Sequence, residues 1–276
     1  MSAERRRAEA LRAVSGHVAR KRFGQHFLAD RGILEAIVAA IAPQANDRLI
    51  EIGPGLGALT RRLLERVTPI AAVEIDRDLA GRLSPLVTKG SLQLFEADAL
   101  SFDFTQAASS LREAGQTGSV RVVGNLPYNI SSPLLVHLLQ FRTLIKDQHF
   151  LLQREVVERI VAGPGSSAYG RLGVLLQAFY EVAALFEVPP EAFEPPPRVQ
   201  SAVVRLAPRA HPLIEDPRPL QRVLAEGFAQ RRKMLRGHLL PWLEQQGVKT
   251  APLDPTLRPE RIDVATWCDL ARQLPN

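Results

Sequence analysis

One short segment, Glu51-Ile-Gly-Pro-Gly-Leu-Gly57, constrains the fold more than any other part of the sequence. It overlaps the end of the apolar run Arg48–Ile52, which predicts a strand, and precedes Ala58–Val67, whose leucines recur at helical spacing. Glycines between a strand and a helix let the backbone pass close to a ligand at the helix N-terminus. The segment therefore predicts an α/β fold with a nucleotide-binding turn. The Gly-x-Gly-x-Gly spacing fits a dinucleotide enzyme, with its Gly-x-Gly-x-x-Gly turn, less well.

Acidic residues stand at the ends of the next two predicted strands. Ile70–Ile75 carries Glu74, seventeen residues after the last glycine of the turn, and Leu92–Glu96 is followed by Asp98. At these places a glutamate can accept both hydroxyls of a ribose, and an aspartate can accept the amino group of an adenine. Each residue alone is equally typical of a solvated strand end or a turn. Together with the glycine turn they predict a site for an adenine nucleoside.

A second special turn, Asn125-Leu126-Pro127-Tyr128, follows the apolar run Val120–Val123. The exocyclic amine of adenine is a poor nucleophile until hydrogen-bond acceptors localise its lone pair. The side-chain oxygen of Asn125 and the carbonyl of Leu126 can accept its two N–H groups. Pro127 stiffens the loop, and Tyr128 offers a flat face on which an extruded base can stack. The two turns together predict methylation of an adenine amine.

Length and composition indicate an ordinary globular chain. Its 276 residues suffice for one large domain and a small one. The single cysteine, Cys268, excludes an internal disulfide, and the six histidines show no ligand spacing, so we expect no metal site. We see no apolar run long enough to span a membrane and no secretory signal, which favours the cytoplasm.

Positive charge is concentrated in two places. Residues 1–22 contain seven arginines and lysines against two glutamates, within a net charge of +6 for the chain. A second cluster, Arg231-Arg232-Lys233 with Arg236, lies in a predicted helix whose inward side carries Met234 and Leu235. Basic runs are usually solvated, but on a protein built for adenine they favour a nucleic-acid substrate.

The rest of the sequence predicts a sheet followed by a helical domain. Helices are expected at Gly32–Ala42, Pro133–Phe141, Arg154–Val161 and Arg171–Tyr180, and strands at His149–Leu152, Ala184–Val188 and Ala202–Leu206, the last two as a hairpin. Pro208–Pro219 breaks the pattern, and helices follow near Leu220–Gln230, Lys233–Gln246 and from Pro259. The predicted domains are a basic extension at 1–19, disordered until bound, a first domain at 20–207 and a helical domain at 208–276.

From about Arg20 to the C-terminus the chain resembles the KsgA (RsmA) family of small-subunit ribosomal RNA adenine dimethyltransferases. Beyond the two turns, the resemblance is carried by Lys21-Arg-Phe-Gly-Gln-His-Phe-Leu28, Tyr169-Gly-Arg-Leu172, Val188-Pro-Pro-Glu-Ala-Phe193, Pro195-Pro-Pro-Arg-Val-Gln-Ser-Ala202 and Phe228-Ala-Gln-Arg-Arg-Lys-Met-Leu235. It implies a Rossmann-like S-adenosylmethionine domain with helices on both faces of the sheet. It also implies dimethylation of two adjacent adenosines in a hairpin near the 3′ end of 16S RNA, during small-subunit assembly. We expect the enzyme to have an α/β fold and to be a monomer.

The resemblance also implies roles for individual residues. The cofactor would be held by Gln25, His26, Leu28, Gly53, Gly55, Glu74, Ile75, Asp98, Ala99 and Asn125. The target base would meet Asn125, Leu126, Pro127, Tyr128 and Phe193, and RNA would meet Arg20, Lys21, Arg22, Arg231, Arg232, Lys233 and Arg236. Position 26 is a departure, since the family commonly has asparagine there, so a backbone contact is the safer expectation.

Three other functions fit parts of the pattern. A related resistance-type enzyme methylates large-subunit RNA; the full helical tail and Leu126 argue against it. An RNA-binding assembly or transcription factor could keep the fold without catalysis, which the intact Asn125 and Tyr128 disfavour. A nicotinamide-dependent oxidoreductase is disfavoured by the glycine spacing and by the lack of a Tyr-x-x-x-Lys set.

Overall fold

The computed structural model of the chain describes all residues except 1–12, 15–16, 19–25, 115–117, 250–252 and 276. Contacts divide the chain into two compact units. Unit 1 is Met1–Arg154 with Ala184–Leu206, and unit 2 is Glu155–Ala183 with Ala207–Asn276. The chain passes between the units three times, and the boundary predicted at 207/208 lies one residue from the third crossing. Residues 155–183 group with the C-terminal helices rather than with the rest of the first predicted domain.

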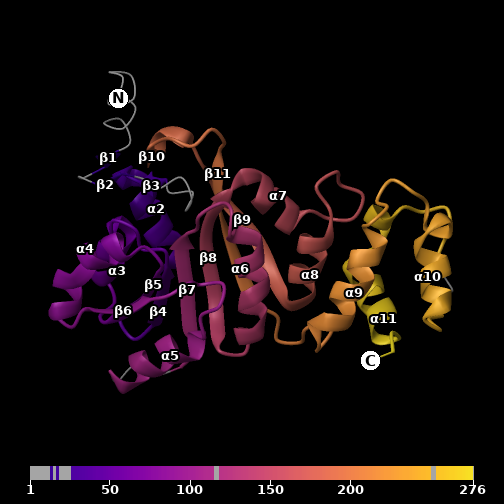
Figure 1. Cartoon of the computed structure of the whole chain (residues 1–276), viewed down its shortest axis with the longest axis horizontal. Helices are drawn as coiled ribbons and strands as arrows, with labels where there is room; N and C mark the ends of the chain where they lie inside the picture. Colours follow the sequence, from indigo (N-terminus) through magenta and orange to yellow (C-terminus); the bar gives the residue numbers. More distant parts are fainter. Residues whose placement is uncertain (1–12, 15–16, 19–25, 115–117, 250–252, 276) are drawn as a thin grey trace. The chain divides into compact units, whose positions relative to one another are not determined.

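Unit 1 is built around a sheet of seven strands in the order β6-β5-β4-β7-β8-β11-β9 (Figure 1). The strands are β4 (Arg48–Ile52), β5 (Ile70–Glu74), β6 (Leu92–Glu96), β7 (Val120–Asn125), β8 (Ile145–Gln153), β9 (Tyr180–Val188) and β11 (Ser201–Pro208). The first five in this order are parallel, and β11 is antiparallel to β8. The carboxyl ends of β6, β5, β4 and β7 therefore share one edge, where ligands of open α/β sheets bind.

Helices cover both faces of this sheet, as predicted. Leu49 joins a core cluster with residues of α2 (Arg31–Ile41), α3 (Ala58–Leu64) and α4 (Arg77–Thr88). Its neighbour Arg48 points to the opposite face, where its guanidinium donates to the carbonyl of Ala108 in α5 (Phe104–Glu113). On that second face the ring of Phe104 packs against His137 of α6 (Ser131–Leu138) and Phe141 of the 3-10 turn η2 (Leu139–Phe141). The predicted Rossmann-like fold is confirmed.

Four short strands were not predicted. β1 (Ala13–Val14) pairs with β2 (His17–Val18), and β3 (Phe27–Leu28) pairs with β10 (Phe193–Glu194). The 3-10 turn η3 (Pro190–Ala192) precedes β10, and its last residue accepts the backbone N–H groups of Ala29 and Asp30. Residues from the start of the chain are thereby fixed beside a loop more than 160 residues later.

A buried ion network explains why β8 begins at Ile145 and not at the predicted His149. Arg121 of β7 donates to Asp147 at 2.8 Å, to Asp47 at 2.8 Å and to the carbonyl of Ile41, the last residue of α2, at 2.6 Å. Burial alone would raise the pKa of Asp147, but the neighbouring His149 and Arg121 lower it to about 2. Asp147 can therefore lie in the interior near the start of β8, because its charge has a buried partner, while Lys146 beside it is exposed.

Unit 2 consists mainly of helices. They are α7 (Arg154–Val161), α8 (Arg171–Phe179), α9 (Pro217–Gly227), α10 (Leu239–Gln245) and α11 (Val264–Arg272), with 3-10 turns η4 (Leu235–Gly237) and η5 (Pro259–Arg261). Gly227 lets α9 approach α11, since a Cβ at this position would lie 2.3 Å from the indole of Trp267. The Tyr169 hydroxyl donates to the carbonyl of Ile262 at 2.8 Å.

The helix predicted at Lys233–Gln246 is wrong in its first half. Residues 228–234 form a turn, and the N–H of Leu235 bonds to the carbonyl of Leu257 at 2.7 Å instead of to a preceding helical turn. Leu235 is buried as expected, but Met234 is 43% exposed. No helix among the described residues is long and apolar enough to cross a membrane.

Candidate active site

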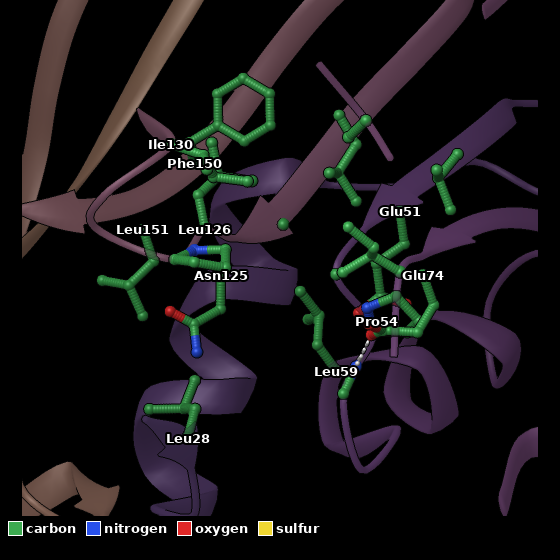
Figure 2. A pocket seen from close by; sticks show the side chains of 18 of the residues that line it. Leu28, Glu51, Pro54, Leu59, Glu74, Asn125, Leu126, Ile130, Phe150 and Leu151 are labelled. Carbon is green, nitrogen blue, oxygen red and sulfur yellow. Dashed lines mark hydrogen bonds between the residues drawn. The ribbon is translucent and has the colours of Figure 1, made fainter. Parts of the chain in front are cut away.

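A pocket of about 270 Å³ lies in unit 1 at the carboxyl edge of the parallel strands (Figure 2). Its wall is formed by the glycine turn after β4, the ends of β5 and β6, the turn after β7, and residues 26–28 near β3. Glu51 and Glu74 stand on one side of the view, and Asn125 and Leu126 on the other. The two turns singled out in the sequence therefore meet in one cavity.

The glycine turn uses backbone conformations that favour glycine. Gly55 has a φ of +56° and Gly57, the N-cap of α3, a φ of +79°. A Cβ at Gly57 would also lie 2.8 Å from the side chain of Leu83. The turn leaves space for a ligand beside the start of the helix.

Two backbone N–H groups hold the carboxylate of Glu74 in the pocket wall. It is 6% exposed, so it is not a solvated strand-end acid. Oε2 accepts the N–H of Gly55 at 3.1 Å, and Oε1 accepts the N–H of Asp76 at 2.9 Å. Burial raises the pKa of Glu74, and these backbone hydrogen bonds oppose the rise. The carboxylate is consequently fixed before any ligand arrives.

After the end of β6, the polar Asp98 and the apolar Ala99 both line the pocket. Asp98 is exposed, and its carboxylate accepts the N–H of Leu100 at 2.9 Å, as in an ordinary turn. It lines the same pocket as the buried Ala99 and as Ile75, which is 47% exposed. A flat apolar group can lie against Ile75 and Ala99 while presenting a donor to Asp98.

Asn125 is oriented by the segment near β3. Its Nδ2 donates to the carbonyl of His26 at 3.0 Å. A carbonyl can only accept, so the amide nitrogen faces His26 and the amide oxygen stays free to accept a donor from a ligand. The contact between Asn125 and residue 26 is made through the backbone of His26.

Tyr128 is fixed by one hydrogen bond and one ring contact. Its hydroxyl bonds to Oγ of Ser201 at 2.7 Å, and burial raises the pKa of Tyr128. The ring of His26 stacks on it with centroids 5.6 Å apart and an interplanar angle of 25°. Nδ1 of His26 lies 2.7 Å from the carbonyl of Pro195, so this nitrogen carries a proton. The ring of Tyr128 therefore already stacks with another planar ring, that of His26, before any ligand binds.

Two pocket groups were not identified from the sequence. Glu51 is 2% exposed, and its Oε2 has no hydrogen-bond partner among the described residues. Burial and the nearby Glu74 raise its pKa to about 7, although Thr60 acts in the opposite direction. His149 is 3% exposed; its Nδ1 lies 3.6 Å from Oδ1 of Asp147, beyond hydrogen-bond distance, and its Nε2 has no hydrogen-bond partner among the described residues. For Glu51, the sequence signal was its position two residues before the first glycine of the turn. For His149 there was no comparable signal, because the polar residues before it obscured the start of β8.

Most of the predicted site residues line this pocket, and some do not. His26, Leu28, Gly53, Gly55, Glu74, Ile75, Asp98, Ala99, Asn125, Leu126, Pro127 and Tyr128 line it. Phe193 is 1% exposed and belongs to the core cluster beside β3, so the structure does not place it in the wall. Gln25, Arg20, Lys21 and Arg22 lie outside the described residues. Within the described ranges no three His, Cys, Asp or Glu side chains are grouped to hold a metal ion.

The second basic cluster lies in unit 2. Arg231 is half-buried, donates to the carbonyl of Ser167 at 2.6 Å and lies 3.8 Å from Glu260. Arg232, Lys233 and Arg236 are exposed. They lie in the turn after α9 and in η4, so the helical arc predicted for them does not exist.

Comparison with known proteins identifies the family. The family model for ribosomal RNA adenine dimethylase matches residues 16–274. A ribosomal RNA small subunit methyltransferase A of Bordetella petrii is 52% identical over 95% of this chain and 97% of its own, and one of Erwinia tasmaniensis is 51% identical over 95% and 96%. A solved dimethyladenosine transferase of Plasmodium falciparum has a TM-score of 0.73 at 25% identity, covering 89% of this chain and 96% of its own. A solved 23S rRNA methyltransferase, ErmE, has a TM-score of 0.61 at 25% identity, covering 90% and 99%. The chain belongs to the ribosomal RNA adenine dimethylase family.

Proposed function

We propose that this enzyme uses S-adenosylmethionine to dimethylate the N6 amines of two adjacent adenosines in a hairpin near the 3′ end of 16S RNA, during assembly of the small ribosomal subunit. Its family membership makes it a ribosomal RNA adenine dimethyltransferase. The donor, the two adenosines and the assembling subunit are the parts we propose. The proposal places the enzyme, as a monomer, in the cytoplasm with the assembling subunits.

One observation carries the choice of donor: the polar groups follow the sheet order. Asp98 follows β6, Glu74 ends β5, the glycine turn follows β4 and Asn125 ends β7, and these four strands are neighbours in that order. S-adenosylmethionine presents adenine, ribose, sulfonium with its methionyl chain, and transferable methyl in the same sequence. Asp98 would accept the adenine amine, Glu74 the ribose hydroxyls, and the turn would receive the methionyl part.

Asn125 and Tyr128 would hold the adenine that receives the methyl group. The free amide oxygen of Asn125 and the carbonyl of Leu126 can accept the N6 hydrogens and aim the lone pair at the methyl group. Tyr128 supports the base by stacking. The sulfonium supplies an intrinsically reactive methyl group, so the protein chiefly aligns the partners and excludes water. No general base is required, because the amine becomes acidic as it is alkylated.

We propose that the exposed charges of the C-terminal turn contact RNA phosphates. The side chains of Arg232, Lys233 and Arg236 are exposed on unit 2. Arg231, in contrast, is held by its hydrogen bond to the carbonyl of Ser167. Changing these three to Gln should weaken binding to small subunits and reduce the slope of log affinity against log salt by about two, since each phosphate contact contributes about 0.7–0.9. A control with Arg66, Arg77 and Lys89 changed to Gln removes the same charge from unit 1. An equal slope in both variants would show that the turn faces solvent.

Methyl transfer to purified ribosomal particles tests the main proposal. Tritium from labelled S-adenosylmethionine should enter small subunits isolated from a strain lacking this activity, and digestion of the RNA should yield two adjacent N6,N6-dimethyladenosines. Large-subunit RNA is the control, because the structure also resembles ErmE. Label in large-subunit RNA alone would overturn the small-subunit assignment. Binding of small subunits without any transfer would favour an assembly factor.

A further inference from the structure

The carboxyl group of Glu51 lies unsatisfied in the pocket wall. It is 2% exposed and lines the cavity, and its Oε2 has no hydrogen-bond partner in the part of the chain that the structure describes. Leaving a buried polar group unpaired is costly, and such groups commonly mark a place where a ligand completes the bonding. The catalytic arrangement proposed above does not use this residue.

Among the described residues, we find no cationic partner for Glu51. Its sheet neighbours are Ala72 on β5 and Val123 on β7, and α2 presents Leu34, Ile37, Val38 and Ile41 to this core. The polar groups that influence it are Thr60 of α3 and Glu74 of β5. Arg121, also on β7, is occupied by Asp47 and Asp147, and His149 lies on β8, one strand beyond Val123. His26, from residues 26–28, and Asp98, after β6, also line the cavity.

We propose that Glu51 determines cofactor specificity: its carboxylate favours the positively charged sulfonium donor over the neutral thioether product. The inference rests on the proposed cofactor. With ribose at the end of β5 and the target amine at the end of β7, the sulfonium between them falls at β4, the strand that carries Glu51. Donor and product differ there by one methyl group and one unit of charge, and a nearby carboxylate distinguishes them by that charge.

This preference has a role in dimethylation. Each adenine consumes two donor molecules, so the product of the first transfer must be exchanged for a second donor. An enzyme that held the product as firmly as the donor would be inhibited between transfers. Burial raises the pKa of Glu51 to about 7, so the group is partly protonated in the free protein and a bound sulfonium would draw it into the charged form.

Calorimetric titration of the purified protein with S-adenosylmethionine and with S-adenosylhomocysteine tests the inference. In the wild type, the ratio of the product's Kd to the donor's Kd should rise about tenfold between about pH 6 and about pH 8, the effect of one charge-assisted contact. In Glu51→Gln the ratio should be lower at about pH 8 and should lose this rise. Ionisation of the ligands themselves affects both proteins equally.

Glu74→Gln is the matched control. It should weaken both ligands by the same factor, because donor and product share the ribose, and at about pH 8, where Glu51 is ionised, it should leave the ratio unchanged. The pH at which the ratio rises should be lower than in the wild type, because Glu74 no longer raises the pKa of Glu51. If the wild type binds neither ligand, the cofactor proposal fails. If both bind and the ratio is the same in the wild type and Glu51→Gln at each pH, the role of Glu51 is refuted while the cofactor stands.

A measurement on the wild type covers the case in which Glu51→Gln does not fold. At about pH 6.5 the amino groups of both ligands stay protonated. Calorimetry in two buffers of different ionisation enthalpy then counts the protons released on binding. Donor binding should release more protons than product binding, and equal release would overturn the proposal.

Discussion

The two ends of the pocket are built in different ways. At the cofactor end, Glu74 bonds to the backbone of Asp76, two residues away, and of Gly55, nineteen residues away. At the acceptor end, Asn125 bonds to His26 across 99 residues and Tyr128 to Ser201 across 73. Consecutive strand ends form the first, whereas distant segments must come together for the second. A substitution at the cofactor end should therefore change affinity, and one at the acceptor end should change turnover.

Asn125→Ala should have the largest effect and should act on turnover. Loss of one oriented acceptor at a reacting centre costs about 2.7–4 kcal/mol, or about a hundredfold to a thousandfold in rate. Cofactor affinity and RNA binding should stay near wild-type values. Asn46→Ala, in an exposed asparagine of unit 1 outside the pocket lining, is the control and should retain most activity. More than a tenth of wild-type turnover in Asn125→Ala would show that the residue does not orient the amine.

Glu74→Ala should act on affinity. Loss of a charge-assisted bond to ribose should weaken S-adenosylmethionine binding by about 1.5–3 kcal/mol, measured by calorimetry. Turnover at saturating cofactor should be affected much less. Glu96→Ala removes an exposed carboxylate from the residue that pairs with Glu74 on β6, and it should leave affinity unchanged. Equal affinities in the two variants would remove Glu74 from the cofactor site.

Ser201→Ala should have a smaller effect at the acceptor end. It removes the partner of the Tyr128 hydroxyl, a bond worth about 0.5–1.5 kcal/mol, and should lower turnover several-fold without changing cofactor affinity. Tyr128→Phe removes the same bond from the other side. The double variant should therefore be no worse than Tyr128→Phe alone. Fully additive losses would show that the two hydroxyls act separately.

Removal of metal ions should have the smallest effect. Methyl transfer from a sulfonium needs alignment rather than a Lewis acid, so turnover on a short protein-free RNA should survive exhaustive chelation. Ribosomal particles are unsuitable for this test unless magnesium is restored. A requirement for zinc that follows the enzyme preparation rather than the RNA would contradict the proposed chemistry.

The sequence predicted the local parts of this molecule well. The strands at Arg48–Ile52 and Leu92–Glu96 and the helix at Arg154–Val161 have the predicted bounds, and the glycine turn joins β4 to α3 as expected. In these segments the apolar spacing and the turn residues indicate the same structure. The cofactor end depends on such local signals, so its residues could be placed in one pocket beforehand.

The remaining features depend on partners far away in the chain. Lys146, Asp147 and Gln148 do not look like a strand, and the burial of Asp147 depends on its ion pair with the buried Arg121. The turn at 228–234 depends on Leu257, which pairs with Leu235. Phe193 carries a family motif, yet β10 pairs with β3 and buries its ring. No short window of sequence contains these partners.

The pairing of β3 with β10 has a consequence for synthesis of the protein. A growing chain that has completed β7 already contains Glu51, Glu74, Asp98 and the glycine turn. It lacks Phe193 and Glu194, to which Leu28 and Phe27 pair, and Ser201, which holds Tyr128. Translation must pass β11 before the acceptor end is complete. The acceptor end is therefore completed later in synthesis than the strand ends that carry Glu74 and Asp98.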